Sequence, residues 1–281
     1  MLHGQARCGK VAGSTPNSRE IALASPLYAD AAVYDILQTP GTAAEVDALE
    51  RVEAAFGAEG ARRDDRLWYE PACGTGRYLR VAAGRGRRVG GYDQDPGMVA
   101  YAARRLGQAV RQAGMTDPMV PGVRPGAVAF AFNPVNTIRH LPDDRALLAH
   151  LAQVEWLLAP GGLYVVGLSL TDYAWLEDEE DLWEAARGGC RISQLVNYLM
   201  PEPGTARARI ETVLSHLTIT RPSGVEHRDD RYDLRCYDER QWKRVLERSP
   251  LRRLGSCDAF GRPLAGRRLP YQLEVLGRRG R

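Results

Sequence analysis

The chain has 281 residues, of which 44% are hydrophobic and 26% are charged, as in an ordinary globular protein. Its 38 basic and 35 acidic residues nearly cancel, and the basic residues are scattered along the sequence. This balance argues against a dedicated nucleic-acid-binding protein. No apolar run approaches the roughly 18 residues that a membrane-spanning helix needs, so we expect no membrane partner.

The five cysteines indicate neither a disulfide framework nor a zinc site, because their number is odd and no two form a CxxC pair. We therefore predict no metal centre. The first twenty residues lack the apolar core of a secretion signal, which makes the cytoplasm the expected location. Residues 1–22 are rich in Gly, Ser, Pro and Arg, and we interpret them as a flexible tail before a single domain at 23–281.

The first two thirds of that domain alternate between predicted helices and strands. Apolar residues at helical spacing predict helices, and short apolar runs that end at glycine or aspartate predict strands. Such alternation is typical of a parallel sheet with helices on both faces. In chain order, the expected elements are a helix at 42–56, a strand at 66–69, a helix at 77–83, a strand at 88–92, a helix at 95–107, strands at 109–113 and 127–132, a helix at 143–158 and a strand at 163–168.

The last third has a different pattern. Residues 191–200, 207–220 and 225–237 are rich in β-forming residues that alternate with charges, and Pro and Gly separate them. We predict an antiparallel layer inserted at about 188–236, which covers a cleft as a lid. The acidic run at 177–181 is interpreted as the start of a solvated helix. A helix at 238–247 and strands at 254–260 and 271–276 complete the expected elements.

A glycine-rich loop carries the strongest functional signal. It runs from Glu70 to Gly76 between a predicted strand and a predicted helix, where glycine lets a ligand approach the backbone closely. Asp93 ends the next strand, a place where a carboxylate commonly binds ribose hydroxyls. These features fit either a dinucleotide or an adenosine-type cofactor. Leu79 stands where a dinucleotide fingerprint has its third glycine, and this difference disfavours a dinucleotide cofactor.

Four segments in order resemble the motifs of class I S-adenosylmethionine-dependent methyltransferases. They are Glu70-x-Ala72-x-Gly74-x-Gly76, Gly91-Tyr92-Asp93-x-x-Pro96-x-Met98, the run from Ala127 to Leu141, and Leu157-Leu158-Ala159-Pro160-Gly161-Gly162. The resemblance implies an α/β fold: a Rossmann-like sheet with helices on both faces and an inserted antiparallel β lid. The nearest subgroup resembles glycine and amino-sugar N-methyltransferases, because of Tyr34-Asp35, the length of the lid and Arg235-Cys236-Tyr237.

The resemblance also implies roles for individual residues. Glu70 would lie near the methionine ammonium of S-adenosylmethionine, and Asp93 would hold its ribose hydroxyls. Asn133 would lie near the methyl-donor end, and His140, in a His-Leu pair, would be the candidate catalytic residue beside the acceptor. The other residues expected around the cofactor are Tyr34, Ala72, Cys73, Gly74, Gly76, Gln94, Met98 and Met115.

Two positions depart from the family pattern. Ala72 replaces the usual first glycine, and Gly114 stands where relatives often have the aspartate that accepts from the adenine amino group. Either Thr116 or Asp117 takes over that role, or cofactor affinity is reduced. The expected reaction is methyl transfer from S-adenosylmethionine to a nitrogen or oxygen of a small-molecule acceptor, with S-adenosylhomocysteine as product.

Alternative functions remain open on the sequence alone. Asn133-Pro134 faintly resembles a motif of amino-base methyltransferases, but Val135 and Asn136 replace its last proline and its stacking aromatic residue. A protein methyltransferase is a further alternative to a small-molecule enzyme. A dinucleotide-dependent oxidoreductase and a non-catalytic cofactor-binding subunit are the other two. For His140, Tyr28 and Tyr34, plain packing competes with a functional role.

Overall fold

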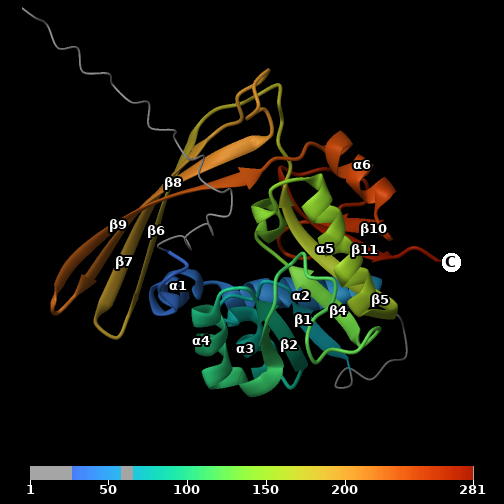
Figure 1. The fold of residues 1–281 in the computed structure, drawn as a ribbon, viewed down its shortest axis with the longest axis horizontal. Helices are drawn as coiled ribbons and strands as arrows, with labels where there is room; N and C mark the ends of the chain where they lie inside the picture. The colour runs from blue at the N-terminus through green and yellow to red at the C-terminus, as the bar shows by residue number, and fades with distance from the viewer. Residues whose placement is uncertain (1–26, 58–65, 281) are drawn as a thin grey trace, which may run out of the picture.

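The computed structural model describes residues 27–57 and 66–280, so the tail predicted at 1–22 lies outside the described residues. Its centre is a seven-stranded sheet with the strand order β10-β11-β5-β4-β1-β2-β3 (Figure 1). These strands are β1 Leu67–Glu70, β2 Arg88–Asp93, β3 Val110–Gln112, β4 Val128–Asn133, β5 Leu158–Ser169, β10 Leu251–Cys257 and β11 Tyr271–Arg278.

Five neighbouring strands of this sheet, β5 to β3 in the order above, are parallel, and β11 runs antiparallel to β5. The carboxyl ends of parallel strands meet at one edge of a sheet, which is where open α/β folds bind their ligands. Glu70, Asp93 and Asn133 are the last residues of β1, β2 and β4. The fold therefore gathers three of the predicted site residues at one edge.

Helices cover both faces of the sheet, as predicted (Figure 1). One apolar core joins α5 and α6 to one face, and a second joins α2, α3 and α4 to the other, because alternate strand residues such as Ala131 and Phe132 point to opposite sides. The helices are α1 Ala31–Gln38, α2 Thr42–Phe56, α3 Arg77–Gly84, α4 Pro96–Leu106, α5 Asp144–Leu157 and α6 Glu239–Arg248.

Aspartate side chains cap the starts of α4 and α6. The Asp95 carboxylate accepts from the Met98 backbone N–H at 2.8 Å, and Pro96 occupies the first turn of α4. Asp238 and Gln241 form a reciprocal capping box at the start of α6. Each such cap contributes about 1 kcal/mol to stability, and each fixes the point at which the chain leaves a strand or loop and enters a helix.

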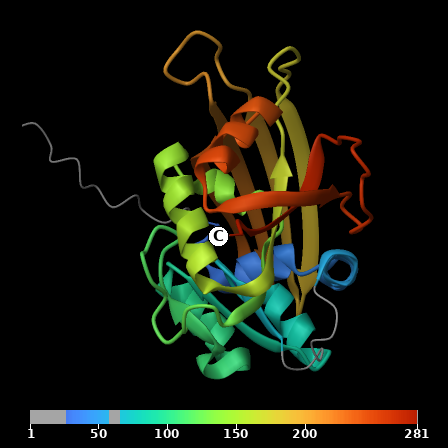
Figure 2. The same cartoon turned by 90° about the vertical axis from the view of Figure 1, so that its right-hand side faces the viewer.

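A second, four-stranded antiparallel sheet extends away from the first (Figures 1 and 2). Its strands are β6 Glu179–Arg187, β7 Cys190–Leu199, β8 Ile210–Arg221 and β9 Gly224–Arg235. At one end, the inner face packs on α1, where Ile192, Leu217 and Ile219 meet Val33 and Leu37. We call this sheet the lid. It contains the three strands predicted at 191–237 and one more.

That additional strand corrects one prediction. The start of a helix at 177–181 is wrong, because Glu179, Glu180 and Asp181 belong to β6. Glu, Leu and Ala favour helix locally, but pairing with β7, such as Asp181 opposite Val196, overrides that preference. The acidic residues lie on an edge strand, where charges discourage pairing with other chains.

Candidate active site

A cleft of about 2120 Å³ lies between the carboxyl edge of the main sheet, α1 and the inner face of the lid. It exceeds the roughly 300–1,000 Å³ of an ordinary ligand pocket, so it has room for a cofactor and an acceptor together. Ten of the twelve predicted site residues line it, and Gly76 and Asn133 do not. The ten are Tyr34, Glu70, Ala72, Cys73, Gly74, Asp93, Gln94, Met98, Met115 and His140.

The glycine-rich loop curls tightly at the edge of the cleft. Ala72, Gly74 and Gly76 all have positive φ angles of 49°, 52° and 70°. A Cβ on Gly76 would lie 2.8 Å from a methyl carbon of Leu106, so this glycine lets α3 and α4 approach each other and does not face the cleft. Gly74 instead faces Tyr34, which covers the loop from α1.

Asp93 links this loop to the end of β2. Its Oδ2 accepts from the Gly74 backbone N–H at 2.8 Å, and its Oδ1 accepts from the Asp95 backbone N–H at 2.9 Å. Burial raises the pKa of Asp93, although these two backbone hydrogen bonds oppose the rise. The carboxylate is thus held rigidly at the cleft wall, where both oxygens keep lone pairs for a ligand's hydroxyl groups.

Glu70 is a buried carboxylate that lacks compensation. Its side chain is 5% exposed, and its Oε2 has no hydrogen-bond partner within residues 27–57 and 66–280. Burial raises the pKa of Glu70 well above its usual range, and Asp93 adds to the rise while Arg77 opposes it. An unpaired buried carboxylate is costly unless a cation reaches it. An ammonium group in the cleft would supply that cation.

The loop after β3 forms the opposite end of the cofactor part of the cleft. Gly114, Met115 and Thr116 line it, beside the buried Met98. The Asp117 carboxylate accepts from the Gly114 backbone N–H at 2.7 Å. A Cβ on Gly114 would lie 3.3 Å from Asp117 Oδ1, so the fold brings an acidic group beside the position where the family's aspartate was expected.

Asn133 does not line the cleft. Its side chain is buried, where Oδ1 accepts from the Tyr164 hydroxyl at 2.6 Å and Nδ2 donates to the Pro71 carbonyl. Both ends of the amide are therefore occupied by the protein itself. Asn133 fastens the end of β4 to the loop that follows Glu70, and any effect of its side chain on a cofactor passes through that loop.

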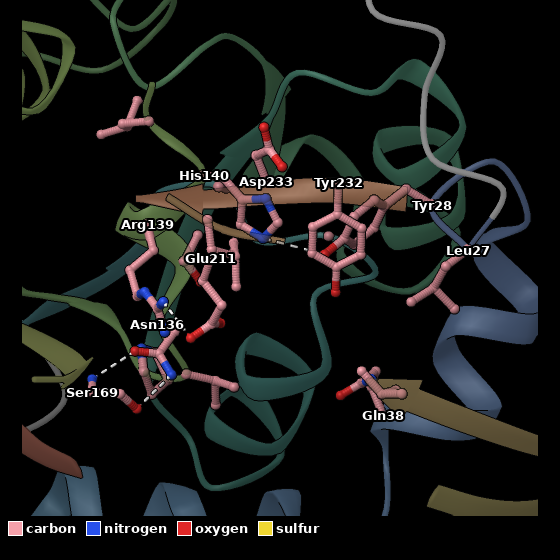
Figure 3. A pocket seen from close by; sticks show the side chains of 18 of the residues that line it. Leu27, Tyr28, Gln38, Asn136, Arg139, His140, Ser169, Glu211, Tyr232 and Asp233 are labelled. Atoms are coloured by element: carbon pink, nitrogen blue, oxygen red, sulfur yellow. Dashed lines mark hydrogen bonds and ion pairs between the residues drawn. The ribbon is translucent and has the colours of Figure 1, made fainter. Parts of the chain in front are cut away.

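His140 lies in an aromatic group in the cleft (Figure 3). Its ring stacks on Tyr232 of β9 with the centroids 5.5 Å apart, and Tyr28 approaches edge-on, with its hydroxyl 3.3 Å from His140 Nε2. Part of the ring keeps surface toward the cleft, but the surrounding protein and the Arg139 charge lower the pKa of His140 to about 4. The imidazole is therefore neutral at physiological pH and can accept a hydrogen bond.

A buried ion pair holds the lid beside His140. Arg139 bridges to Glu211 of β8 at 3.1 Å, and its Nε donates to the Arg235 carbonyl at 3.0 Å (Figure 3 shows the bridge). Glu211 and Tyr232 carry no signal in the sequence, because only the pairing of distant strands brings them to the cleft. Arg139 carried a signal, since it precedes His140 in the quoted fourth motif.

The cleft wall is acidic. Among the described residues that line it, carboxylates outnumber guanidinium groups by twelve to three. Glu45, Glu211 and Asp233 are paired with arginines, and the remaining excess of carboxylates favours cationic ligands over anionic ones. The three arginines are Arg77, Arg139 and Arg231. The twelve carboxylates are Glu45, Glu70, Asp93, Asp95, Asp172, Glu177, Asp178, Glu179, Asp181, Glu211, Asp230 and Asp233.

Among residues 27–57 and 66–280, no cluster of three or more His, Cys, Asp or Glu side chains has the arrangement of a metal site. Of the helices described, none combines the length and the apolar character that crossing a bilayer requires.

The sequence from residue 69 to residue 166 matches the family described as "Methyltransferase domain". This part of the chain carries the sequence pattern of that family. It contains the end of β1, the glycine-rich loop, β2 and β4, so the family match falls on the ligand edge of the sheet. The predicted enzyme type is thereby confirmed. No curated protein matches the chain.

The fold is that of solved methyltransferase structures. DesVI from Streptomyces venezuelae superposes with a TM-score of 0.67 at 18% identity, over 87% of this chain and 95% of that one. The sugar N-methyltransferase KedS8 from a Streptoalloteichus species superposes with a TM-score of 0.67 at 19% identity, over 99% of this chain and 100% of that one. The amino pentose methyltransferase CalS10 from Micromonospora echinaspora superposes with a TM-score of 0.60 at 19% identity, over 84% of this chain and 90% of that one. The predicted class I fold is confirmed, and the CalS10 structure holds S-adenosylmethionine, the cofactor that the sequence predicts for this enzyme.

Proposed function

We propose that this methyltransferase transfers the methyl group of S-adenosylmethionine to an amine nitrogen of a small-molecule acceptor. The excess of carboxylates along the cleft carries the proposal, because it attracts an acceptor that enters as an ammonium ion. Two neighbours in fold, KedS8 and CalS10, are named as a sugar N-methyltransferase and an amino pentose methyltransferase, which supports the same class of acceptor.

The residues at the sheet edge fit the cofactor. Glu70, with its unpartnered buried oxygen, would accept from the methionine ammonium, and Asp93 would accept from the ribose hydroxyls. Met98 would pack on the adenine, and Asp117 would take the place of the family's aspartate at the adenine amino group. When bound, the cofactor supplies a methyl group on a positively charged sulfur, which is already activated for transfer.

The chain's own residues then govern positioning and the state of the acceptor. The acceptor nitrogen must lose a proton before it attacks, because an ammonium has no lone pair. During transfer the N–C bond forms, the S–C bond breaks, and the second proton leaves the product nitrogen for water. The neutral His140 ring can accept an N–H hydrogen bond from the acceptor and orient the lone pair, while the lid excludes water.

The acidic wall also weighs against two alternatives. Nucleic acids carry a negative charge at each phosphate, and proteins that bind them neutralise those charges with Lys and Arg. The cleft offers three arginines, and Arg139 is already paired with Glu211. A neutral hydroxyl acceptor can donate hydrogen bonds to the carboxylates but carries no charge for them to attract, so the same wall favours amine over hydroxyl acceptors.

A paired acceptor screen tests the proposal. The wild-type enzyme is incubated with S-adenosylmethionine and a panel of amino sugars and other amines, each beside the analogue with a hydroxyl in place of the amine. Release of S-adenosylhomocysteine is measured, with oligonucleotides as a third group. Turnover confined to amines supports the proposal. Turnover of the hydroxyl analogues or oligonucleotides alone contradicts it.

A further inference from the structure

A buried chain of polar groups runs behind the cofactor part of the cleft. His150 of α5 places Nδ1 3.2 Å from the Met115 carbonyl oxygen and Nε2 2.7 Å from the Tyr164 hydroxyl. That hydroxyl lies 2.6 Å from Asn133 Oδ1, and Asn133 Nδ2 donates to the Pro71 carbonyl. His150, Tyr164 and Asn133 are each at most 1% exposed. The chain therefore connects the adenine end of the site to the loop beside Glu70.

The orientation of the Asn133 amide is fixed by its neighbour. A backbone carbonyl can only accept a hydrogen bond, so the amide nitrogen must face Pro71 and the amide oxygen must face Tyr164. Asn133 Oδ1 consequently needs a hydrogen from the Tyr164 hydroxyl. Burial raises the pKa of Tyr164 well above its usual range, so the hydroxyl keeps its single proton.

This chain of polar groups has one hydrogen fewer than its hydrogen bonds require. Three contacts each need one: Met115 O to His150 Nδ1, His150 Nε2 to the Tyr164 oxygen, and the Tyr164 oxygen to Asn133 Oδ1. Tyr164 supplies one hydrogen and a neutral imidazole supplies one. Burial lowers the pKa of His150 to about 4, so a third hydrogen is absent at neutral pH. One of the three contacts must lack a hydrogen.

We propose that His150 is a positioning residue that donates from Nε2 to Tyr164 and, through Tyr164 and Asn133, holds the loop that carries Glu70 toward the methionine end of the cofactor. The two shorter contacts, at 2.7 and 2.6 Å, then have hydrogens, and the longer one, at 3.2 Å to Met115, lacks one. The methionine end of the site is fixed from behind, and the adenine edge is left free to adjust. This inference rests on the proposed function, which places the methionine and adenine ends.

The opposite tautomer makes a different prediction. With the hydrogen on Nδ1, His150 would donate to Met115, and the single Tyr164 hydrogen could serve either His150 Nε2 or Asn133 Oδ1 but not both. The Met115 loop would then be fixed, and the loop after Glu70 would lose its hydrogen-bonded connection to His150. The two states fasten opposite ends of the cofactor site, so they can be separated by the part of the ligand whose binding changes.

Two matched variants reproduce the two donors. His150→Gln carries its side-chain nitrogen at the distance of imidazole Nε2, and the shorter His150→Asn carries it near the position of Nδ1. Binding of S-adenosylhomocysteine and of adenosine, which lacks the methionine part, is measured by calorimetry, together with KM for S-adenosylmethionine and kcat. We expect His150→Gln to stay within about threefold of the wild type.

His150→Asn and Tyr164→Phe are expected to weaken S-adenosylhomocysteine binding about tenfold and to leave adenosine binding unchanged. Equal losses for both ligands, or a loss confined to adenosine, would overturn the proposal, since they would indicate a purely structural role or the opposite tautomer. A wild type that binds neither ligand would instead refute the proposed function.

A measurement on the unaltered protein keeps the inference testable if a variant does not fold. The ¹⁵N chemical shifts of a histidine ring distinguish a nitrogen that carries hydrogen from one that does not. We expect His150 to carry hydrogen on Nε2 at pH 7. A His150 ring with hydrogen on Nδ1, or on both nitrogens, would contradict the proposed donor pattern, whatever the enzyme's acceptor is.

Discussion

Tyr34 covers Gly74 so closely that a Cβ on the glycine would lie 3.4 Å from Tyr34 Cε1. Tyr34 belongs to α1, and its neighbour Asp35 accepts hydrogen bonds from Arg80 of α3 at 2.5 Å, from Arg187 at the end of β6 at 2.8 Å and from Tyr101 of α4. One short helix therefore joins the lid, the core and the cofactor loop, and the lid's position is coupled to the loop that would hold the cofactor.

Asp35 is expected to matter far more for stability than its partner in the lid. Its carboxylate is buried, and Asp35→Ala leaves the Arg80 charge without compensation, which costs about 3–5 kcal/mol. Arg187 is half-exposed, with 46% of its side chain accessible, so Arg187→Ala should cost less than about 1 kcal/mol. Urea denaturation of both variants measures the difference, and equal losses would show that the carboxylate is not the centre of the network.

The pH dependence of this network has a definite sign. Burial alone would raise the pKa of Asp35, but the hydrogen bonds from Arg80 and Arg187 outweigh it and lower the pKa. The stability that Asp35 contributes is therefore present above its unfolded pKa of about 3.9 and lost as the pH falls through the lower folded value. The wild type and Asp35→Ala should differ by a constant amount from pH 5 to 8, and converge only in acid.

Asp93 should control cofactor affinity without controlling the fold. Asp93→Asn keeps an oxygen for the Gly74 N–H but loses the acceptor of the Asp95 N–H. It also removes the charge that strengthens hydrogen bonds to ribose hydroxyls, which is worth about 1.5–3 kcal/mol. We expect S-adenosylhomocysteine to bind about ten- to a hundredfold more weakly in calorimetry. Asp143→Asn, which alters the cap of α5, is the matched control. Unchanged affinity in folded Asp93→Asn would remove Asp93 from the cofactor site.

The main sheet could be predicted because its signals are local. Strands β1, β2 and β4 are short apolar runs that end at Glu70, Asp93 and Asn133, and each end is marked in the sequence. The α1 helix was missed, since its eight residues give little periodicity. Its start depends on the Asp30 cap, which accepts from the Val33 backbone N–H, and its apolar face depends on lid strands far along the chain.

The candidate site, like the fold, could be predicted from the sequence only in part. Glu70 and Asp93 follow from the rule that parallel strands end at one edge, and the structure brings both to the cleft. Glu211 and Tyr232 could not be predicted, because an alternating strand sequence does not reveal which face will point inward or what lies opposite. Asn133 was expected near the methyl-donor end, yet its amide is engaged by Tyr164 and Pro71, a contact between three separate segments.

Glu70 should lower the stability of the cofactor-free protein while strengthening the binding of the cofactor. Burial raises the pKa of its carboxyl in the folded protein, so ionisation of Glu70 disfavours the fold, and this cost grows as the pH rises from the unfolded pKa through the folded pKa. Glu70→Gln should therefore raise Tm of the cofactor-free protein by a few degrees, since about 1 kcal/mol shifts Tm by roughly 2–4 °C in a chain of this size. The same variant should lose most of its affinity for S-adenosylmethionine.

Titration calorimetry, which measures cofactor affinity, and scanning calorimetry, which measures Tm, together test this prediction. Glu177→Gln, which removes an exposed carboxylate from the same cleft, serves as the control and should leave Tm unchanged. Because the ammonium favours the ionised form of Glu70, binding should also release protons. Such release appears as a dependence of the binding enthalpy on the buffer's ionisation enthalpy. A Glu70→Gln variant that binds the cofactor normally would contradict the assignment.

His140 offers the sharpest test of how the reaction is assisted. If its neutral ring accepts a hydrogen bond from the acceptor nitrogen during transfer, His140→Ala should lower kcat by about a hundredfold, the lower end of the range for groups that handle a proton. S-adenosylhomocysteine affinity should stay within a few-fold, because the aromatic contacts of the ring are with Tyr28 and Tyr232, which lie outside the cofactor loop. His140→Asn keeps a polar acceptor and should recover part of the loss.

The pH profile separates this role from that of a conventional base. The pKa of about 4 means that His140 is already neutral from pH 5 upward, so its own titration would lower the rate only in more acidic solution. Any rise in rate between pH 6 and 9 should follow the pKa of the acceptor amine, and should move when acceptors of different basicity are compared. A limb of the pH–rate profile that stays fixed near pH 6.5 for every acceptor and vanishes in His140→Asn would make His140 a conventional base.

The size of the kcat loss gives a second test. A tenfold or smaller loss of kcat in His140→Ala, tracking thermal stability, would remove the residue from the mechanism. Proximity and the exclusion of water by the lid would then be the source of rate.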